Sequence, residues 1–397
     1  MKDFSELGIS EGAGGLDNRN ISKASPKPDS KIEIESEDNI SLSAVLRELQ
    51  GVTVATKADQ GDLNYITRIL TTEAGANRPL EDPPALTLRN WHARLKNLDF
   101  GESQYHRASL AVSIAFLCET GRRNITVYPA DLDFVWSTIY EALADTSIPY
   151  TVSRSSQGFL TIALSSLIKD GNIEELFRLH VWEADGRRGT PELAIHSHQP
   201  FIQSWILAGE GKDYTYEACP EDTNASITLS EYALTWSTNT AGESGKNYKV
   251  HPMSSTVTNQ NKPVHIVQKS AASHTRNMTY TVPTHVFHKS VVAPGTFHAT
   301  LALFDSYRGF HRDAPVLGPS DGTSYTAKRD TATLTAPELA RVVEIARERE
   351  LSHINNMNSP KIRGAIAWAG RIVGWLALLV IAVMYVKGVS PFSSGGA

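Results

Sequence analysis

The residues best suited to chemistry in this sequence are two histidines, His196 and His198, which are separated by a single serine. In a β-strand, residues i and i+2 point to the same face, so both imidazoles can approach one point inside a curved sheet. Neutral imidazole is the commonest side-chain ligand for transition metals in proteins. The pair therefore predicts two of the ligands of a metal site.

A facial metal site needs a third ligand, and this ligand can come from a distant part of the chain. The segment Val282-Pro-Thr-His-Val-Phe-His-Lys289 offers two candidates, His285 and His288. Because they are three residues apart, a regular strand would point them to opposite faces. Only one of them is therefore expected to join His196 and His198.

These segments resemble the two sequence motifs of the cupin superfamily. His-x-His followed by the strand 204–211, which ends in Gly-x-Gly, is similar to the first motif. Pro283 and His288 match the second motif, Pro-x-Gly-x-x-His, and His285 stands at the usual glycine position. The resemblance implies a jelly-roll β-barrel whose metal ligands are His196, His198 and His288, with His285 as an alternative ligand or a neighbour of the ligands.

Within the superfamily, the chain is most similar to the cysteine dioxygenase-like thiol dioxygenases. These enzymes also carry an apolar strand ending in Trp, as at 179–182, before a Gly-rich turn and His-x-His. The resemblance implies ferrous iron held by three neutral histidines, with open positions for substrate and dioxygen. Three histidines also suit zinc, nickel or copper.

The chain departs from that family at several positions. Gln203 stands where many cupins have a glutamate ligand, and it is expected to be a weak ligand or a hydrogen-bond donor beside the metal. Ala302 and Phe304 stand where thiol dioxygenases have the histidine and tyrosine that handle protons. The sequence therefore leaves the substrate open.

The pocket around the metal is expected to have an apolar wall and a polar anchor. The predicted wall consists of Phe201, Trp205 and Phe287. Arg154 and Arg178 are the candidates for binding a substrate carboxylate.

Three functions are compatible with this site. The first is a membrane-anchored, non-haem iron dioxygenase-like oxidoreductase acting on a small organic substrate. The second is a non-catalytic cupin-fold protein that serves as a binding module or scaffold at a membrane surface. The third is an isomerase or hydrolase that uses the same histidines with a different divalent metal. Oxygen consumption and metal content distinguish them.

Composition argues against two other classes of protein. The 397 residues carry a formal net charge of −5, and no cluster of lysine and arginine stands out. A nucleic-acid partner is not expected, because phosphate contacts require a concentrated basic surface. The only two cysteines, Cys118 and Cys219, form no CxxC pair, so neither a disulfide framework nor a thiolate zinc site is predicted.

The chain is predicted to be mainly β, with a cupin-like jelly-roll barrel between helical segments. Composition and hydrophobic periodicity divide it into the following parts. They are a disordered tail at 1–40, a helical region at 41–145, a β-barrel domain at 150–306 with a polar insertion at about 221–262, a loop at 307–334 and a helical stalk at 335–354.

The C-terminal segment 364–386 is predicted to be a single transmembrane helix. It contains one charged residue, Arg371, and about 20 apolar residues are enough to cross a bilayer. Trp368, Trp375 and Tyr385 are suited to the membrane interface. Because the N-terminus lacks the apolar core of a signal peptide, the protein is expected to be tail-anchored, with most of the chain in the cytosol.

Overall fold

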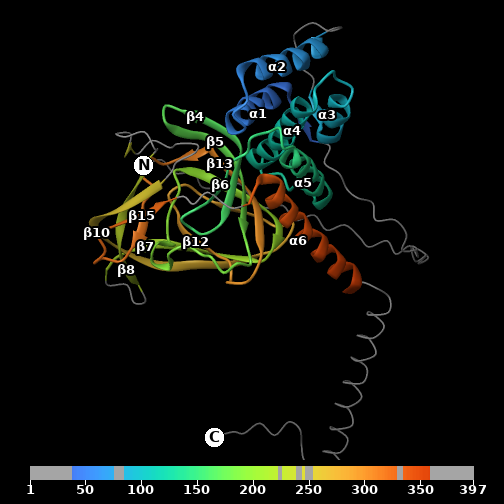
Figure 1. Ribbon diagram of the computed structural model, residues 1–397. Coiled ribbons are helices and arrows are strands. Elements are labelled where there is room, and N and C mark those ends of the chain that lie inside the picture. Colours follow the sequence, from blue (N-terminus) through green and yellow to red (C-terminus); the bar gives the residue numbers. More distant parts are fainter. Residues whose placement is uncertain are drawn as a thin grey trace, which may run out of the picture. The chain divides into compact units, whose positions relative to one another are not determined.

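The structure is a computed structural model, shown in Figure 1, and it describes residues 38–75, 85–221, 226–237, 244–245, 254–328 and 334–357. Nearly all of the predicted disordered tail, and the whole of the predicted membrane helix at 364–386, lie outside these residues. Of the helices that are described, none combines the length and the apolar character needed to cross a bilayer.

Five helices form a block on one side of the molecule. They are α1 (Leu42–Ala55), α2 (Gln60–Gly75), α3 (Leu88–Leu95), α4 (Glu102–Arg122) and α5 (Pro129–Ala144). Their starts follow the sequence: the Ser41 hydroxyl accepts a hydrogen bond from the Ala44 amide at 3.2 Å, and Pro129 occupies the first turn of α5. Short strands β1 (Asn39–Ile40) and β2 (Leu86–Thr87) pair beside them.

The helical block covers one face of an antiparallel six-stranded sheet (Figure 1). The strand order is β11-β6-β13-β5-β4-β3. The bounds are β3 Val152–Arg154, β4 Leu160–Lys169, β5 Asn172–Trp182, β6 Pro200–Gly209, β11 Thr279–Val282 and β13 His298–Phe310. In β5, Phe177 and Leu179 pack in the core shared with the helices, whereas Arg178 and His180 line a cavity on the other face. The alternation along β5 thus separates core from cavity.

A second, seven-stranded antiparallel sheet lies across that cavity, and the two sheets form a curled half-barrel. Its strands are β7 Gly211–Cys219, β8 Ile227–Ser237, β9 Ser244–Gly245, β10 Ser254–His274, β12 Phe287–Val291, β14 Val316–Gly318 and β15 Ser324–Lys328.

The predicted insertion and the predicted loop both contain strands in the structure. The described part of 221–262, expected as an insertion, supplies β8 and the start of β10, and the expected loop 307–334 contains β14 and β15. Tyr232 and Val257 are buried while most of their neighbours are polar and less buried. This is the alternation of a strand with one solvent-exposed face. The high content of Ser, Thr and Asn makes this alternation difficult to recognise in the sequence.

Helix α6 (Ala336–Met357) corresponds to the predicted stalk, but its part from Leu339 to Glu350 packs on the domain. Leu339 and Val343 are fully buried in the core with the helical block. The Glu350 carboxylate accepts a hydrogen bond from the Gly209 amide at 2.6 Å, and the Arg347 guanidinium donates to the Leu207 carbonyl at 2.9 Å. These contacts fix α6 against the end of β6.

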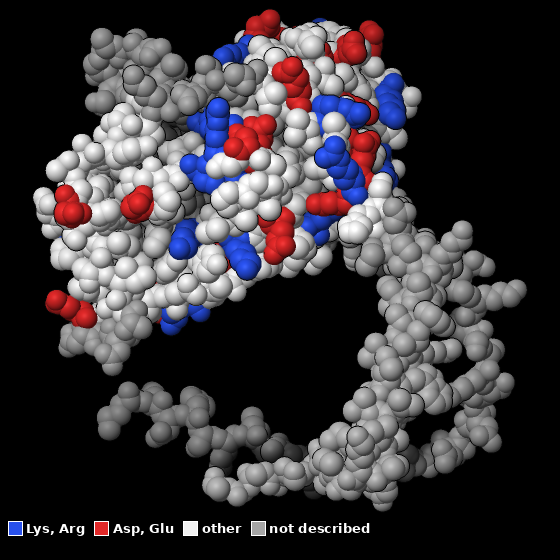
Figure 2. All heavy atoms as spheres, turned by 60° about the horizontal axis from the view of Figure 1, so that its bottom comes forward, with Lys and Arg blue, Asp and Glu red and all other residues white. Residues whose placement is uncertain are grey.

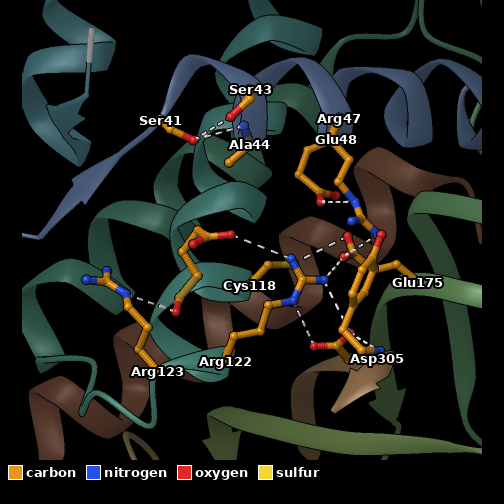
Figure 3. Close-up of polar contacts among 12 residues, drawn as sticks. Ser41, Ser43, Ala44, Arg47, Glu48, Cys118, Arg122, Arg123, Glu175 and Asp305 are labelled. Carbon is orange, nitrogen blue, oxygen red and sulfur yellow. Dashed lines mark hydrogen bonds and ion pairs between the residues drawn. The ribbon is translucent and has the colours of Figure 1, made fainter. Parts of the chain in front are cut away.

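A buried ionic cluster joins the helical block to the six-stranded sheet (Figure 3). We call it the junction cluster, and its members are Arg47, Glu48, Cys118, Arg122, Glu175 and Asp305. The Arg122 guanidinium binds the Glu175 carboxylate and donates to Asp305 at 3.0 Å. Glu48 accepts from the Ser165 hydroxyl at 3.0 Å and shares a hydrogen bond with Glu175. Two helices and two strands therefore meet in the junction cluster, and Ser165 contacts it from a third strand, β4.

We expect Glu48→Gln to remove part of the pH dependence of stability. Burial, and then the neighbouring Glu175 carboxylate, raise the pKa of Glu48 well above 4.5. The folded protein holds this proton more tightly than the unfolded chain, so stability falls as pH rises from about 4.5 through the folded pKa, by up to about 1.4 kcal/mol per pH unit. Glutamine mimics the protonated acid and should flatten this slope.

Urea unfolding between pH 5 and 8 measures the effect. Glu141→Gln, at an exposed position on α5, is the matched control and should leave the slope unchanged. Parallel stability curves for wild type and Glu48→Gln would contradict the assignment of the proton to Glu48.

Candidate metal centre

The two histidines of His-x-His lie on a segment that behaves as an additional strand. The His196 amide donates to the His288 carbonyl at 3.0 Å, and the His288 amide donates back at 2.8 Å. On the other side, the Leu317 amide donates to the Ile195 carbonyl at 2.8 Å. The segment 195–199 therefore bridges β12 and β14, and the expected alternation points both histidines into the cavity.

The three predicted ligands converge on one point. One ring nitrogen from each of His196, His198 and His288 lies within 4.8 Å of the others, and the Nε2 atoms of His198 and His288 are 3.0 Å apart. A divalent ion about 2.1 Å from each nitrogen requires nitrogen–nitrogen separations of about 3 to 3.5 Å. The separation of 3.0 Å between the His198 and His288 nitrogens meets this requirement.

Hydrogen bonds to the second ring nitrogens orient two of the imidazoles. His196 Nδ1 lies 2.9 Å from the Ala194 carbonyl, and His288 Nδ1 lies 2.9 Å from the buried carboxylate of Asp213. Both acceptors require a proton on Nδ1, which leaves the lone pair on Nε2. A carboxylate or carbonyl behind a histidine is the usual support of a metal ligand.

The electrostatic surroundings keep two of the predicted ligands, His196 and His198, neutral. Burial, and then the neighbouring His288, lower the pKa of His196 to about 4. Burial, and then His196, lower the pKa of His198 well below 6.5. Because only the neutral imidazole binds a metal, both residues are in the ligating form near pH 7. The donor set therefore fits a divalent transition metal.

We expect Asp213→Asn to weaken metal binding by about 10- to 100-fold, the usual cost of losing a carboxylate behind a ligating histidine. The amide retains the shape, but it lacks the charge that makes His288 a strong ligand. Competition with a chelator of known affinity measures the change. Asp313→Asn, at an exposed position by the cavity mouth, is the control. Equal affinities for both variants would exclude this role for Asp213.

Gln203 and Trp205, expected beside the metal, lie on the opposite face of β6. Ile202 and Ser204 line the cavity, so their neighbours point toward the helices. Gln203 accepts a hydrogen bond from Arg308, and Trp205 is fully buried in the core.

The two phenylalanines expected in the wall also lie elsewhere. The Phe201 ring packs under the Arg308 guanidinium at 3.9 Å, and Phe287 belongs to a cluster on the far face of the seven-stranded sheet. Phe287 precedes His288 in β12, so alternation turns it away from the cavity. The apolar wall instead comes from other residues, including Phe159, Leu176, Trp182, Ile202 and Phe304.

Of the remaining predicted residues, His285 and Arg178 line the cavity, and Arg154 does not. His285 stacks on His311 with ring centres 4.1 Å apart, and it has a positive φ of 62°. Arg154 is engaged by Glu183 and Asp185 at 2.9 Å each. Arg178 is buried and lines the cavity, and its charge contributes to the lowered pKa of His198.

Sequence reasoning missed Asp213 and Tyr280. Tyr280 lines the cavity, stacks on His274 at 4.3 Å, and has a pKa that burial and Asp213 raise, so its hydroxyl stays protonated. Asp213 is opposite Ser290 in the β7–β12 pairing. A signal for it exists in the sequence only once the register of two strands about 75 residues apart is known.

A second group of potential ligands in the described residues, formed by Glu48, Cys118 and Glu175, belongs to the junction cluster. Arg122 and Arg47 already supply positive charge there, at 3.4 Å from Glu175 in the case of Arg47. Burial raises the pKa of Cys118, which donates to Glu175 at 3.6 Å. This group is a structural ionic network.

Comparisons with known proteins give structural neighbours only. No model of a protein family matches the sequence, and no curated protein does. Among solved structures, a cupin-like protein from Thermotoga maritima is similar, with 16% identity over 44% of this chain and 90% of that chain and a TM-score of 0.23.

Two further neighbours are enzymes. An oxalate decarboxylase variant from Bacillus subtilis shares 11% identity over 41% of this chain and 30% of that chain, with a TM-score of 0.19. A structure described as a DMSP lyase shares 11% identity over 67% of this chain and 94% of that chain, with a TM-score of 0.22. TM-scores near 0.2 are too low to assign an activity to this chain.

Proposed function

We propose that this chain is a cupin-type metalloprotein that binds one divalent ion, ferrous iron, through His196, His198 and His288. The observation that carries the proposal is the convergence of three histidines, two of them held neutral and two oriented through Nδ1, inside a cavity of about 890 Å³. Pockets of this size are typical of small-molecule sites.

We further propose that the protein is a dioxygenase-like oxidoreductase acting on an organic acid. When bound, iron would supply the redox chemistry with dioxygen. The protein's own residues have separate tasks: the buried guanidinium of Arg178 binds the acid group, and the protonated Tyr280, whose hydroxyl is hydrogen-bonded to Asp213, forms part of the cavity wall. Leu176 and Phe304 exclude water from the reacting part.

Oxygen uptake by the iron-loaded protein tests the reaction. An organic acid should stimulate uptake, and Arg178→Met should raise the KM for that acid while metal content stays unchanged. Absence of stimulated uptake by the fully iron-loaded protein, over a panel of carboxylic acids, would remove the oxidoreductase proposal and leave the metal site.

One observation favours a non-catalytic binding protein as the second candidate. Ala302 and Phe304 line the cavity, so the positions where thiol dioxygenases have proton-handling groups are apolar here. A binding protein would retain its ligand without turnover. Recovery of the unchanged acid after incubation with iron-loaded protein and dioxygen would support this alternative.

We also propose attachment to a membrane through the segment 364–386, on the strength of its apolar composition. Charges of both signs are mixed on the face shown in Figure 2, and no extended basic patch is visible there among the described residues, so attraction to acidic lipids is a weaker alternative. A chain ending at Pro360 that still fractionates with membranes would exclude the helical anchor.

A further inference from the structure

The cavity is much larger than a small acid requires. It measures about 890 Å³ and lies between the two sheets. An acid of six or seven non-hydrogen atoms, at roughly 20 to 30 Å³ per atom by comparison with liquid water, would fill less than a quarter of that volume. The remaining space has room for a further part of the ligand.

An apolar surface leads away from the metal centre across successive strands. His196 pairs with Val316 on β14, Val316 pairs with Tyr232 on β8, and Leu234 on β8 pairs with Val257 on β10. These three side chains and Tyr232 all line the cavity and pack in one apolar cluster. From 195–199 to β10 are three strand spacings of about 4.8 Å, so the surface extends about 14 Å, which matches an extended alkyl chain of roughly ten carbons.

The charge around the metal determines which chemical group of the ligand binds there. Imidazole ligands carry no negative charge, so both charges of a bound divalent ion remain at the site, and Asp213 behind His288 cancels one of them. A buried excess of positive charge favours an anionic group. The cavity therefore combines an anion site with a long apolar surface.

We propose that the substrate is an amphipathic carboxylate, with its acid group at the metal and Arg178 and an apolar tail of roughly eight to ten carbons, or an aromatic group of that length, along β14, β8 and β10. The inference rests on the proposed metal site for the position of the acid group. The tail surface is independent of it, because it consists of Val316, Tyr232, Leu234 and Val257.

Calorimetric titration of the full chain with acetate, hexanoate and decanoate tests the proposal, using cobalt-loaded protein so that a change in the visible spectrum reports contact with the metal. Affinity should rise about fourfold per methylene until the surface is covered. Quenching of tryptophan fluorescence gives a second readout, because Trp182 lines the cavity.

Leu234→Glu should reduce decanoate affinity at least tenfold and leave acetate affinity and cobalt content unchanged, because it places a charge on the tail surface alone. Thr235→Glu, on the neighbouring position of β8 and outside the cavity lining, is the matched control. Thermal unfolding of both variants checks that they fold.

The outcomes separate the two proposals. Cobalt-loaded protein that binds acetate and decanoate equally would overturn the amphipathic substrate and leave the metal site intact. Protein that binds no cobalt, but binds decanoate with the expected dependence on chain length, would overturn the metal site while supporting the tail surface. Loss of decanoate binding in Thr235→Glu as well as Leu234→Glu would also count against the tail surface.

Discussion

Replacing His288 with alanine should reduce bound divalent metal from about one ion per chain to less than a tenth of an ion. The residue is one of the three proposed ligands, and its Nε2 is 3.0 Å from that of His198. Loss of a ligand should cost more than the roughly 10- to 100-fold expected for its supporting carboxylate. Metal content after dialysis, measured by mass spectrometry, checks the result, and His196→Ala and His198→Ala should behave alike.

His285→Ala is the matched control for this experiment. It removes a histidine three residues from His288, at the mouth of the same cavity, but its ring stacks on His311 outside the ligand group. Metal content should remain near that of the wild type. If His285→Ala and His288→Ala lose metal equally, the ligand assignment is wrong.

Replacing Arg122 with methionine should destabilise the protein by about 3 to 5 kcal/mol, the usual cost of leaving a buried charge unpaired. Arg122 pairs with Glu175 and Asp305, whose side chains are 0% and 1% exposed. Methionine retains much of the apolar volume of the side chain, so the change mainly removes the charge. Urea unfolding at pH 7 measures the free-energy difference.

The adjacent Arg123 provides a control at the end of the same helix (Figure 3). Its guanidinium pairs with Asp38 at 3.2 Å, and its side chain is 43% exposed. Arg123→Met should cost less than about 1 kcal/mol, because solvent screens surface pairs. Similar losses for both variants would show that the junction cluster is no stronger than a surface pair.

The helical block could be predicted because its signals are local. Ser41 caps α1 and Pro129 starts α5, and both features are visible in the sequence. The strands β8 and β10 were harder to predict from the sequence. A strand with one solvent-exposed face and many Ser, Thr and Asn residues resembles a polar loop in composition. Only pairing with β7 and β14 makes them part of a sheet.

The common direction of His196 and His198 could be predicted because alternation within one short segment is independent of the rest of the fold. His196 and His198 needed only the period of a strand. The same period gives Ile202 and Ser204, which line the cavity, and it turns Gln203 and Trp205 away from the cavity. The prediction that placed these two side chains beside the metal therefore departed from the alternation. Asp213 depends on the register between β7 and β12.

The reciprocal backbone hydrogen bonds between His196 and His288 have a consequence for the metal-free protein. They hold two ligands together through the peptide ladder, whether or not an ion is bound. In small zinc domains the ion itself drives folding, and chelation unfolds the chain. Here, overnight chelation should leave the circular dichroism spectrum unchanged, and the stripped protein should regain one ion per chain on simple mixing. The centre would then be a preformed site that binds its metal reversibly, so the fraction of occupied sites would follow the concentration of available metal.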